Sequence, residues 1–186
     1  AIEDENEIIL KHFIDSLTVQ KYIKNAQNII DIGTGAGFPG IPLAIVNEKS
    51  NIVLLDSLNK RINFLNNVIQ KLELSNVKAI HGRAEDLAKI VQHREKYDIV
   101  ISRAVAPFNV LLEYMLPFNK VNSYTIAMKG SNIEEVDISN NALKKLGGKI
   151  EKIEKINLPN TDIKRNIIIV RKIEETPKKF PRKAGI

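Results

Sequence analysis

The chain has 186 residues, enough for one domain with a single continuous hydrophobic core. It is 44% hydrophobic and 27% charged, the balance of an ordinary globular protein, and no apolar run reaches the roughly 18 residues that a membrane span needs. The sequence has no cysteine, which excludes disulfides, thiolate metal sites and cysteine nucleophiles. No basic and then apolar leader precedes the first charged residues, so a cytoplasmic protein is expected.

The net charge of +6 is concentrated at one end of the chain. Residues 1–163 carry 20 basic and 20 acidic side chains, whereas residues 164–186 carry 8 basic and 2 acidic ones. The end of the chain contains a basic cluster made of Lys178, Lys179, Arg182 and Lys183. Such a cluster favours contact with the phosphates of a nucleic acid, and Phe180 could stack on a base. A solvated, frayed terminus is the alternative.

Short β-branched runs alternate with amphipathic stretches, a pattern typical of a mostly parallel sheet with helices on both faces. The predicted strands are Asn28–Ile32, Ile52–Asp56, Val77–His81, Asp98–Ser102 and Tyr124–Met128. Asn59–Leu72 has the spacing of a helix whose apolar stripe faces the sheet. This stripe consists of Ile62, Leu65, Val68, Ile69 and Leu72.

Beyond Gly147 and Gly148 the pattern changes to two extended runs. The runs Lys149–Ile156 and Asn166–Arg171 are separated by a turn that contains Pro159. They predict an antiparallel hairpin that closes an otherwise parallel sheet.

A glycine-rich loop, Asp31–Gly40, directly follows the first predicted strand. Three of its glycines are spaced as G-x-G-x-G, namely Gly33, Gly35 and Gly37. Phe38 stands where a dinucleotide fingerprint requires its third glycine. The loop therefore favours S-adenosylmethionine, which lacks a pyrophosphate and presents a compact aminoacyl sulfonium. Asp31 could hold the ammonium group through a water. The alternative for the whole loop is a glycine-rich turn that only reverses the chain.

Polar residues also follow the next two predicted strands. Asp56, with Ser57 beside it, lies 21 residues after Gly35, where a carboxylate can accept both hydrogen bonds of a ribose diol. A solvated aspartate at the end of a strand is the alternative. Ala84 and Glu85 follow the third strand, where residues of this fold contact the adenine, but they also suit the start of a helix.

Arg103 ends the fourth predicted strand at the carboxyl edge of the sheet, where open α/β sheets hold their ligands. We expect it to be the cation of the reacting centre, and we assign no general base. Without cysteine, the covalent route to carbon 5 of pyrimidines is closed. The segment Ser102–Phe108 lacks the Asn/Asp-Pro-Pro-aromatic turn that serves exocyclic amines. An aromatic ring nitrogen such as guanine N7 is still compatible, because its in-plane lone pair can attack a sulfonium methyl in line without a base.

The order and spacing of several segments resemble the bacterial 16S rRNA (guanine-N7)-methyltransferase family called RsmG or GidB, over nearly the whole chain. The segments are His12–Leu17 (HFIDSL), Asp31–Ile45 (DIGTGAGFPGIPLAI), Leu54–Leu65 (LLDSLNKRINFL), Ser102–Ala104 (SRA), Met128–Gly130 (MKG) and Thr176–Gly185 (TPKKFPRKAG). The resemblance implies one α/β domain over residues 1–186, with the class I, Rossmann-like fold of S-adenosylmethionine-dependent methyltransferases. Its sheet would be seven-stranded and mostly parallel, with the C-terminal hairpin at one end and residues 173–186 forming a basic tail. Residues 1–27 would form a helical cap whose first part is missing from this chain.

The resemblance also implies methylation of guanine 527 of 16S rRNA at N7, by direct transfer without a covalent enzyme intermediate. Gly33 and Phe38 would contact the cofactor at the first loop, Ala84 and Glu85 on the adenine side, and Arg103 near the reacting end. The sequence departs from the family pattern at Ala36, where proline is common.

Two further segments each have two interpretations under this resemblance. His12, Asp15 and Ser16 would form an edge of the active site, with local helix packing and capping as the alternative. Lys129 would meet an RNA phosphate, with an ordinary solvated lysine as the alternative.

The expected partner is 16S rRNA or the 30S subunit, bound by a monomer without a metal ion and without a membrane. Two other functions stay open at this point. One is methylation of a small molecule by the same fold, which the basic tail disfavours. The other is a non-catalytic RNA-binding assembly factor, which the cofactor motifs disfavour.

Overall fold

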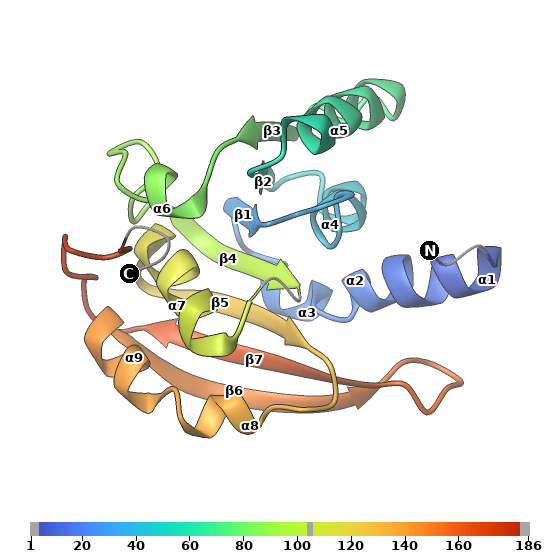
Figure 1. The fold of residues 1–186 in the computed structure, drawn as a ribbon. Helices are drawn as coiled ribbons and strands as arrows, with labels where there is room; N and C mark the ends of the chain where they lie inside the picture. Colours follow the sequence, from blue (N-terminus) through green and yellow to red (C-terminus); the bar gives the residue numbers. More distant parts are fainter. Residues whose placement is uncertain (1–3, 104–105, 183–186) are drawn as a thin grey trace.

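The structure, a computed structural model, describes residues 4–103 and 106–182 and is built on one sheet (Figure 1). The strands are β1 (Asn28–Ile32), β2 (Asn51–Asp56), β3 (Val77–His81), β4 (Tyr97–Arg103), β5 (Asn119–Lys129), β6 (Gly148–Asn157) and β7 (Lys164–Lys172). Their order is β3-β2-β1-β4-β5-β7-β6. Strands β1 to β5 are parallel, and β7 runs antiparallel to both β5 and β6. The expected fold class and C-terminal hairpin are confirmed.

Most helices are short and lie between the strands. The N-terminal ones are α1 (Glu5–Ile8), the π-helix η1 (Ile9–Ile14), α2 (Asp15–Leu17) and α3 (Gln20–Ile23). The others are α4 (Gly40–Val46), α5 (Asn59–Lys71), α6 (Ala84–Leu87), α7 (Phe108–Met115), the 3-10 helix η2 (Leu116–Phe118), α8 (Glu134–Asp137) and α9 (Asn140–Leu146). In Figure 1 the N-terminal helices extend to the right, well beyond the sheet.

Alternation along the strands divides the core into two layers, one on each face of the sheet. In β1, Ile30 and Ile32 belong to the layer formed with α6, α7, α8 and α9. Ile29 belongs to the other layer, which is formed with α3, α4 and α5. The strands therefore bury both faces, as expected for parallel strands between helices.

Two sequence expectations need correction. Leu72 was expected on the buried stripe of α5, but it is half exposed because the helix ends at Lys71. β5 begins at Asn119, five residues before the predicted start at Tyr124, because the buried Asn119 side chain donates to the Tyr124 carbonyl and extends the pairing to Tyr97. The residues between them are polar or half exposed, which hides this extension from the hydrophobic pattern.

The basic tail is packed along the domain as far as it is described. Ile173 and Glu174 donate backbone N–H groups to the Gly147 carbonyl, and Phe180 is buried in the layer formed with α7. The Arg94 guanidinium donates to the carbonyls of Thr176 and Phe180. Residues 173–182 are therefore not the frayed terminus that the sequence left open.

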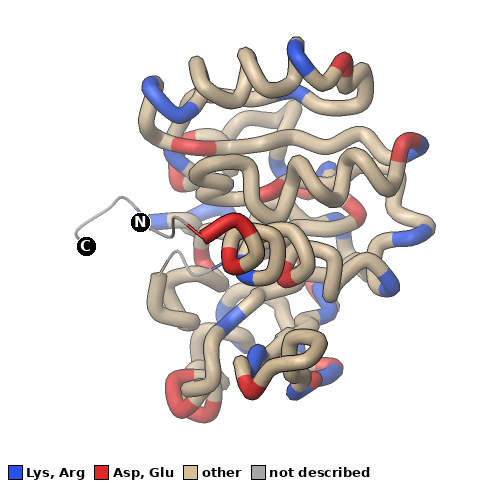
Figure 2. Tube along the Cα trace, turned by 90° about the vertical axis from the view of Figure 1, so that its right-hand side faces the viewer, with Lys and Arg blue, Asp and Glu red and all other residues tan. Residues whose placement is uncertain are grey.

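Charge is spread over the molecule instead of forming one face of a single sign. In Figure 2, basic and acidic segments are interspersed along the trace, and an acidic stretch marks the first turns of the chain. No described helix is long and apolar enough to cross a membrane. Across residues 4–103 and 106–182, no group of three or more metal-ligating side chains is found.

Candidate active site

The glycine-rich loop after β1 is fixed by its neighbour β2. The backbone N–H groups of Gly33 and Thr34 donate to the Leu55 carbonyl at 2.8 and 3.0 Å. At Gly37 the backbone φ is +96°, and a Cβ there would lie 2.6 Å from Cγ1 of Ile41, so packing requires glycine. Gly35 has a φ of +61°, but a Cβ there would meet nothing within 4 Å. The loop thus leaves open space beside Gly35, where a ligand can approach the backbone.

Asp31 lies fully buried beneath this loop. Its Oδ2 accepts hydrogen bonds from Thr34 Oγ1 at 2.7 Å and from the Gly40 N–H at 2.9 Å. Its Oδ1 is also buried and has no hydrogen-bond donor among the described residues. Burial raises the pKa of Asp31 to about 6. A buried carboxylate oxygen without a partner is a place where a donor or cation from a ligand would be stabilised.

A cavity of about 310 Å³ lies beside the loop, between the ends of β1, β2 and β3. It is lined by Ile32, Gly33, Leu55, Asp56, Ser57, Gly82, Arg83, Ala84, Glu85 and Tyr114. Five of the expected cofactor-binding residues therefore line this one cavity. They are Gly33, Asp56, Ser57, Ala84 and Glu85. A larger cavity of about 730 Å³ lies at the opposite edge, near the start of β2 and β3, and contains none of these residues.

Asp56 already has partners within the chain. Its Oδ2 accepts from the Gly35 N–H at 2.9 Å and from Arg61 Nη1 at 3.1 Å, and its Oδ1 accepts from the Leu58 N–H at 2.9 Å. The expected ribose acceptor therefore also orders the glycine loop. Arg61, which the sequence did not single out, would have to share this carboxylate with a diol.

The far wall of the cavity comes from α6 and α7. Ala84 and Glu85 form the first turn of α6, so the interpretation as a helix start is confirmed. They also line the cavity, and their contact with the adenine stays a prediction. Tyr114 reaches the cavity from α7, and burial, followed by the charges of Glu85 and Glu113, raises the pKa of its phenol. No sequence signal pointed to Tyr114, because it lies near the end of a largely apolar helix.

Arg103 stands at the end of β4 among groups from the N-terminal helices. Its Nη1 donates to the Lys11 carbonyl at 3.1 Å and to Asp15 Oδ2 at 3.4 Å, and its Nη2 lies 3.2 Å from Nδ1 of His12. Burial lowers the pKa of Arg103, whereas the carboxylates of Asp15 and Asp31 raise it. A guanidinium with carboxylate partners remains charged. The role of Arg103 as the cation of the reacting centre stays a prediction.

Phe38 is the centre of an aromatic cluster that covers the loop. The His12 ring stacks on it with 5.1 Å between centroids, and the Phe13 ring meets it edge-on at 5.2 Å. The Arg103 guanidinium lies 5.4 Å from the Phe38 centroid. Burial and the Arg103 charge lower the pKa of His12, so its Nδ1 can accept from the guanidinium. The His12–Leu17 segment thus packs against the glycine-rich loop, while the Ser16 hydroxyl donates to the His12 carbonyl within the helix. A role of this segment as an edge of the active site stays a prediction.

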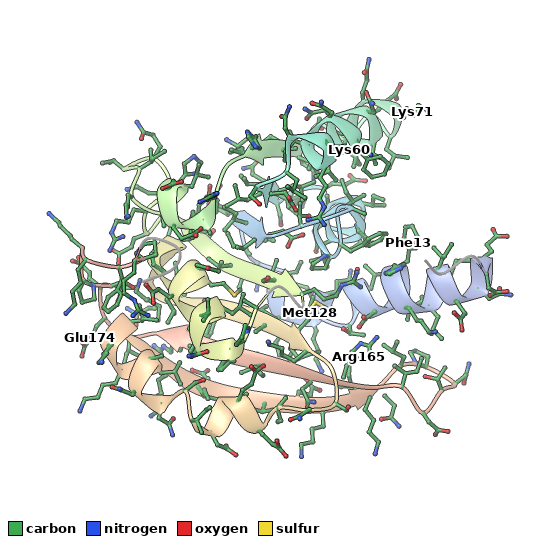
Figure 3. The ribbon with its side chains drawn as sticks, viewed as in Figure 1. Phe13, Lys60, Lys71, Met128, Arg165 and Glu174 are labelled. Carbon is green, nitrogen blue, oxygen red and sulfur yellow. The ribbon has the colours of Figure 1, made fainter. Side chains whose placement is uncertain are left out.

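Asp15 joins this cluster to the C-terminal hairpin. Its Oδ2 accepts from Arg165 Nε at 3.0 Å as well as from Arg103. Figure 3 labels Arg165 below the N-terminal helices and Phe13 on their opposite side. The sequence did not predict Arg165 at the site, because only the pairing of β7 with β5 brings it there.

The described residues that were expected to contact RNA have different surroundings. Lys129 is nearly buried, and its Nζ donates to the Ala106 carbonyl at 2.6 Å and pairs with Glu135 at 2.8 Å. Arg182 pairs with Glu113 at 2.7 Å. The side chains of Lys178 and Lys179 are exposed. Lys183, also expected to contact RNA, lies outside the described residues.

The sequence resembles known proteins along most of its length. The model of the GidB family, rRNA small subunit methyltransferase G, matches residues 1–168. Ribosomal RNA small subunit methyltransferase G of Clostridium botulinum is 53% identical over 189 residues, covering 100% of this chain and 79% of that protein. The protein of the same name from Acetivibrio thermocellus is 55% identical over 186 residues, covering 100% and 77%.

The fold also resembles that of solved structures. A SAM-dependent methyltransferase from Aquifex aeolicus superposes with a TM-score of 0.65 at 19% identity, over 92% of this chain and 95% of that one. The family match over residues 1–168 and the two relatives that are 53% and 55% identical lead to one conclusion: the chain belongs to the GidB family of rRNA small subunit methyltransferase G proteins.

Proposed function

We propose that this protein transfers a methyl group from S-adenosylmethionine to N7 of a guanine in 16S rRNA, the guanine 527 of its family. The observation that carries the proposal is the joining of two half-sites at the carboxyl edge of the sheet. The glycine loop and its cavity form one half, and the cluster of His12, Phe38 and Arg103 forms the other. Such an edge is where ligands of open α/β sheets bind.

The residues of the first half-site fit S-adenosylmethionine. The buried, unpartnered Oδ1 of Asp31 suits its ammonium group, and the open side of Gly35 leaves room for its aminoacyl portion. Asp56 would hold the ribose, and Ala84 and Glu85 would lie on the adenine side. When bound, the cofactor supplies a methyl group made electrophilic by its positive sulfur.

The residues around the second half-site are suited to positioning a methyl acceptor and not to removing a proton from it. Arg103 is a permanent donor and cannot accept a proton at neutral pH. The Nδ1 of His12 faces the Arg103 guanidinium at 3.2 Å and is not directed at an acceptor as a free base. An acceptor that needs no deprotonation fits this arrangement, and guanine N7 is one, because it carries a lone pair and no proton.

The proposed partner is 16S rRNA or the 30S subunit, met by a monomer in the cytoplasm. The exposed Lys178 and Lys179 would neutralise RNA phosphates. Lys129 and Arg182 would contact RNA phosphates only if they gave up their ion pairs with Glu135 and Glu113.

Mass-spectrometric mapping of methylated guanines tests the proposal. 16S rRNA from cells lacking the protein would be incubated with S-adenosylmethionine and the purified protein, both as free RNA and within 30S subunits. One new 7-methylguanosine at the family position is expected. Methyl transfer only to small metabolites, or a different modified base, would contradict the proposal.

A further inference from the structure

One buried carboxylate connects three distant parts of the chain at the active site. Asp15 lies in α2 and is only 2% exposed, yet its Oδ2 accepts from Arg103 in β4 and from Arg165 in β7. These arginines lie 88 and 150 positions away from it in the sequence. The fold thus assembles a cation, an anion and a second cation at one point of the sheet edge.

The two guanidinium groups are like charges, and the carboxylate between them offsets their repulsion. Burial is the main cause that lowers the pKa of Arg103, and the positive charge of Arg165 lowers it further, as expected for two neighbouring cations. The charge of Asp15 acts in the opposite direction. An anion placed between two cations removes most of this repulsion and fixes both donors through hydrogen bonds.

Part of each guanidinium stays available to a ligand. The side chains of Arg103 and Arg165 are 19% and 24% exposed. Within the described part of the chain, Arg103 Nε and Arg165 Nη2 donate to no other residue. The group carries a net charge of +1, with donors left over for an anionic group such as an RNA phosphate.

We propose that Asp15 is a positioning residue, which holds Arg103 and Arg165 as one pair that grips a backbone phosphate of the RNA strand carrying the acceptor base. The inference rests on the proposed function, because it names the part of the substrate that meets this edge of the site. Asp15 would thus promote a reaction on a negatively charged substrate, although it is itself negative, because it orders two positively charged side chains.

A simpler role for Asp15 would be to tether the N-terminal helices to the sheet. The same helices have a second tether, since Glu154 in β6 pairs with Lys21 at 2.6 Å and also accepts from the Tyr22 hydroxyl. Glu154 touches none of the site residues in these pairs. Glu154→Gln is therefore the matched control, because it weakens the tether and leaves the arginine pair intact.

The experiment compares wild type, Asp15→Asn, Arg165→Gln and Glu154→Gln in methyl transfer to 30S subunits, with RNA affinity and melting temperature measured on the same samples. For Asp15→Asn, we expect the kcat to fall by about tenfold or more, because the two donors lose their common orientation. Its RNA affinity should change far less than kcat, because the weakened grip on one phosphate is offset by the removal of a negative charge. Glu154→Gln should keep kcat within about twofold of wild type, since its site is intact.

Arg165→Gln covers the case in which Asp15→Asn does not fold, and it should lower kcat on its own while leaving cofactor affinity unchanged. An equal loss of kcat in Glu154→Gln and Asp15→Asn would overturn the inference in favour of a tether. If Asp15→Asn or Arg165→Gln were as active as an active wild type, the inference would be overturned as well. A wild type that methylates no small-subunit RNA would overturn the proposed function, and this inference with it.

Discussion

Asp31 changes its charge within the range of ordinary buffers, because burial raises its pKa to about 6. If its carboxylate holds the ammonium group of the cofactor, the ionised form binds and the protonated form does not. We therefore expect S-adenosylmethionine affinity to be constant above pH 7 and to fall below pH 6, by at most about tenfold per pH unit. Calorimetry between pH 5 and 8 measures this. Asp31→Asn should bind weakly at every pH, and a wild-type affinity that does not change from pH 5 to 7 would remove Asp31 from the site.

Two glycines of the same loop should respond differently to an added methyl group. Gly37→Ala would place a Cβ against Ile41 and Leu65, and its positive φ adds strain, so we expect a loss of about 2–4 kcal/mol in the free energy of unfolding. Gly35→Ala meets open space and should cost about 1 kcal/mol. It should nevertheless weaken cofactor binding more than its effect on stability suggests, because the methyl group occupies the ligand's side of the loop. Urea denaturation and calorimetry on both variants separate the two effects, and normal cofactor affinity in Gly35→Ala would contradict this assignment.

At the level of single residues, the sequence predicted side chains that stand at the ends of strands. Arg103 and Asp56 follow apolar runs, so the topology alone brings them to one edge of the sheet. Arg61, Tyr114 and Arg165 could not be predicted in the same way. Their positions depend on a helix turn or on the register of a strand pair, which a hydrophobic pattern does not specify.

At the level of elements, the hairpin was predicted and the path of the tail was not. β-Branched residues mark both strands, at every third position along β6 and four in a row in β7. The contacts of Arg94 with Thr176 and Phe180 instead span more than 80 residues of sequence. Composition alone described the tail as a basic segment. Its packing involves hydrogen bonds from the Arg94 guanidinium to the carbonyl groups of Thr176 and Phe180, which composition does not reveal.

The tail has two sets of basic residues with different surroundings. Replacing Lys178 and Lys179 with Gln should flatten the salt dependence of RNA binding by roughly 0.7–0.9 log units for each RNA phosphate that the variant no longer neutralises. Replacing Arg182 with Gln should change this slope less, because Arg182 is paired with Glu113, and should lower the melting temperature instead. Cofactor affinity should stay unchanged in both. RNA affinity measured from low to high salt checks the slopes, and an unchanged slope in the double lysine variant would make the tail a structural feature only.

For the whole molecule, both core layers pack against the same sheet, and the cofactor cavity lies at the ends of its central strands. Neither layer can lose its packing without exposing the strands that support the other. We therefore expect one cooperative unfolding transition, seen at the same temperature by circular dichroism and by tyrosine fluorescence. Two separate transitions would show that the half of the sheet with β5, β6 and β7 unfolds on its own.

Ligand binding to such a molecule should stabilise all of it at once. S-adenosylmethionine at a concentration of 100 times its Kd should add about 2.7 kcal/mol to the free energy of unfolding. For a chain of this size, that corresponds to a rise in melting temperature of roughly 5–10 °C. Asp31→Asn should lose most of this rise, whereas Glu154→Gln, on the outer strand β6, should keep it. The comparison is independent of methyl transfer, since it needs no RNA. A wild type whose melting temperature does not move with the cofactor would contradict the assignment of the cavity, because a ligand held between β1, β2 and β3 cannot bind the folded state alone without stabilising it.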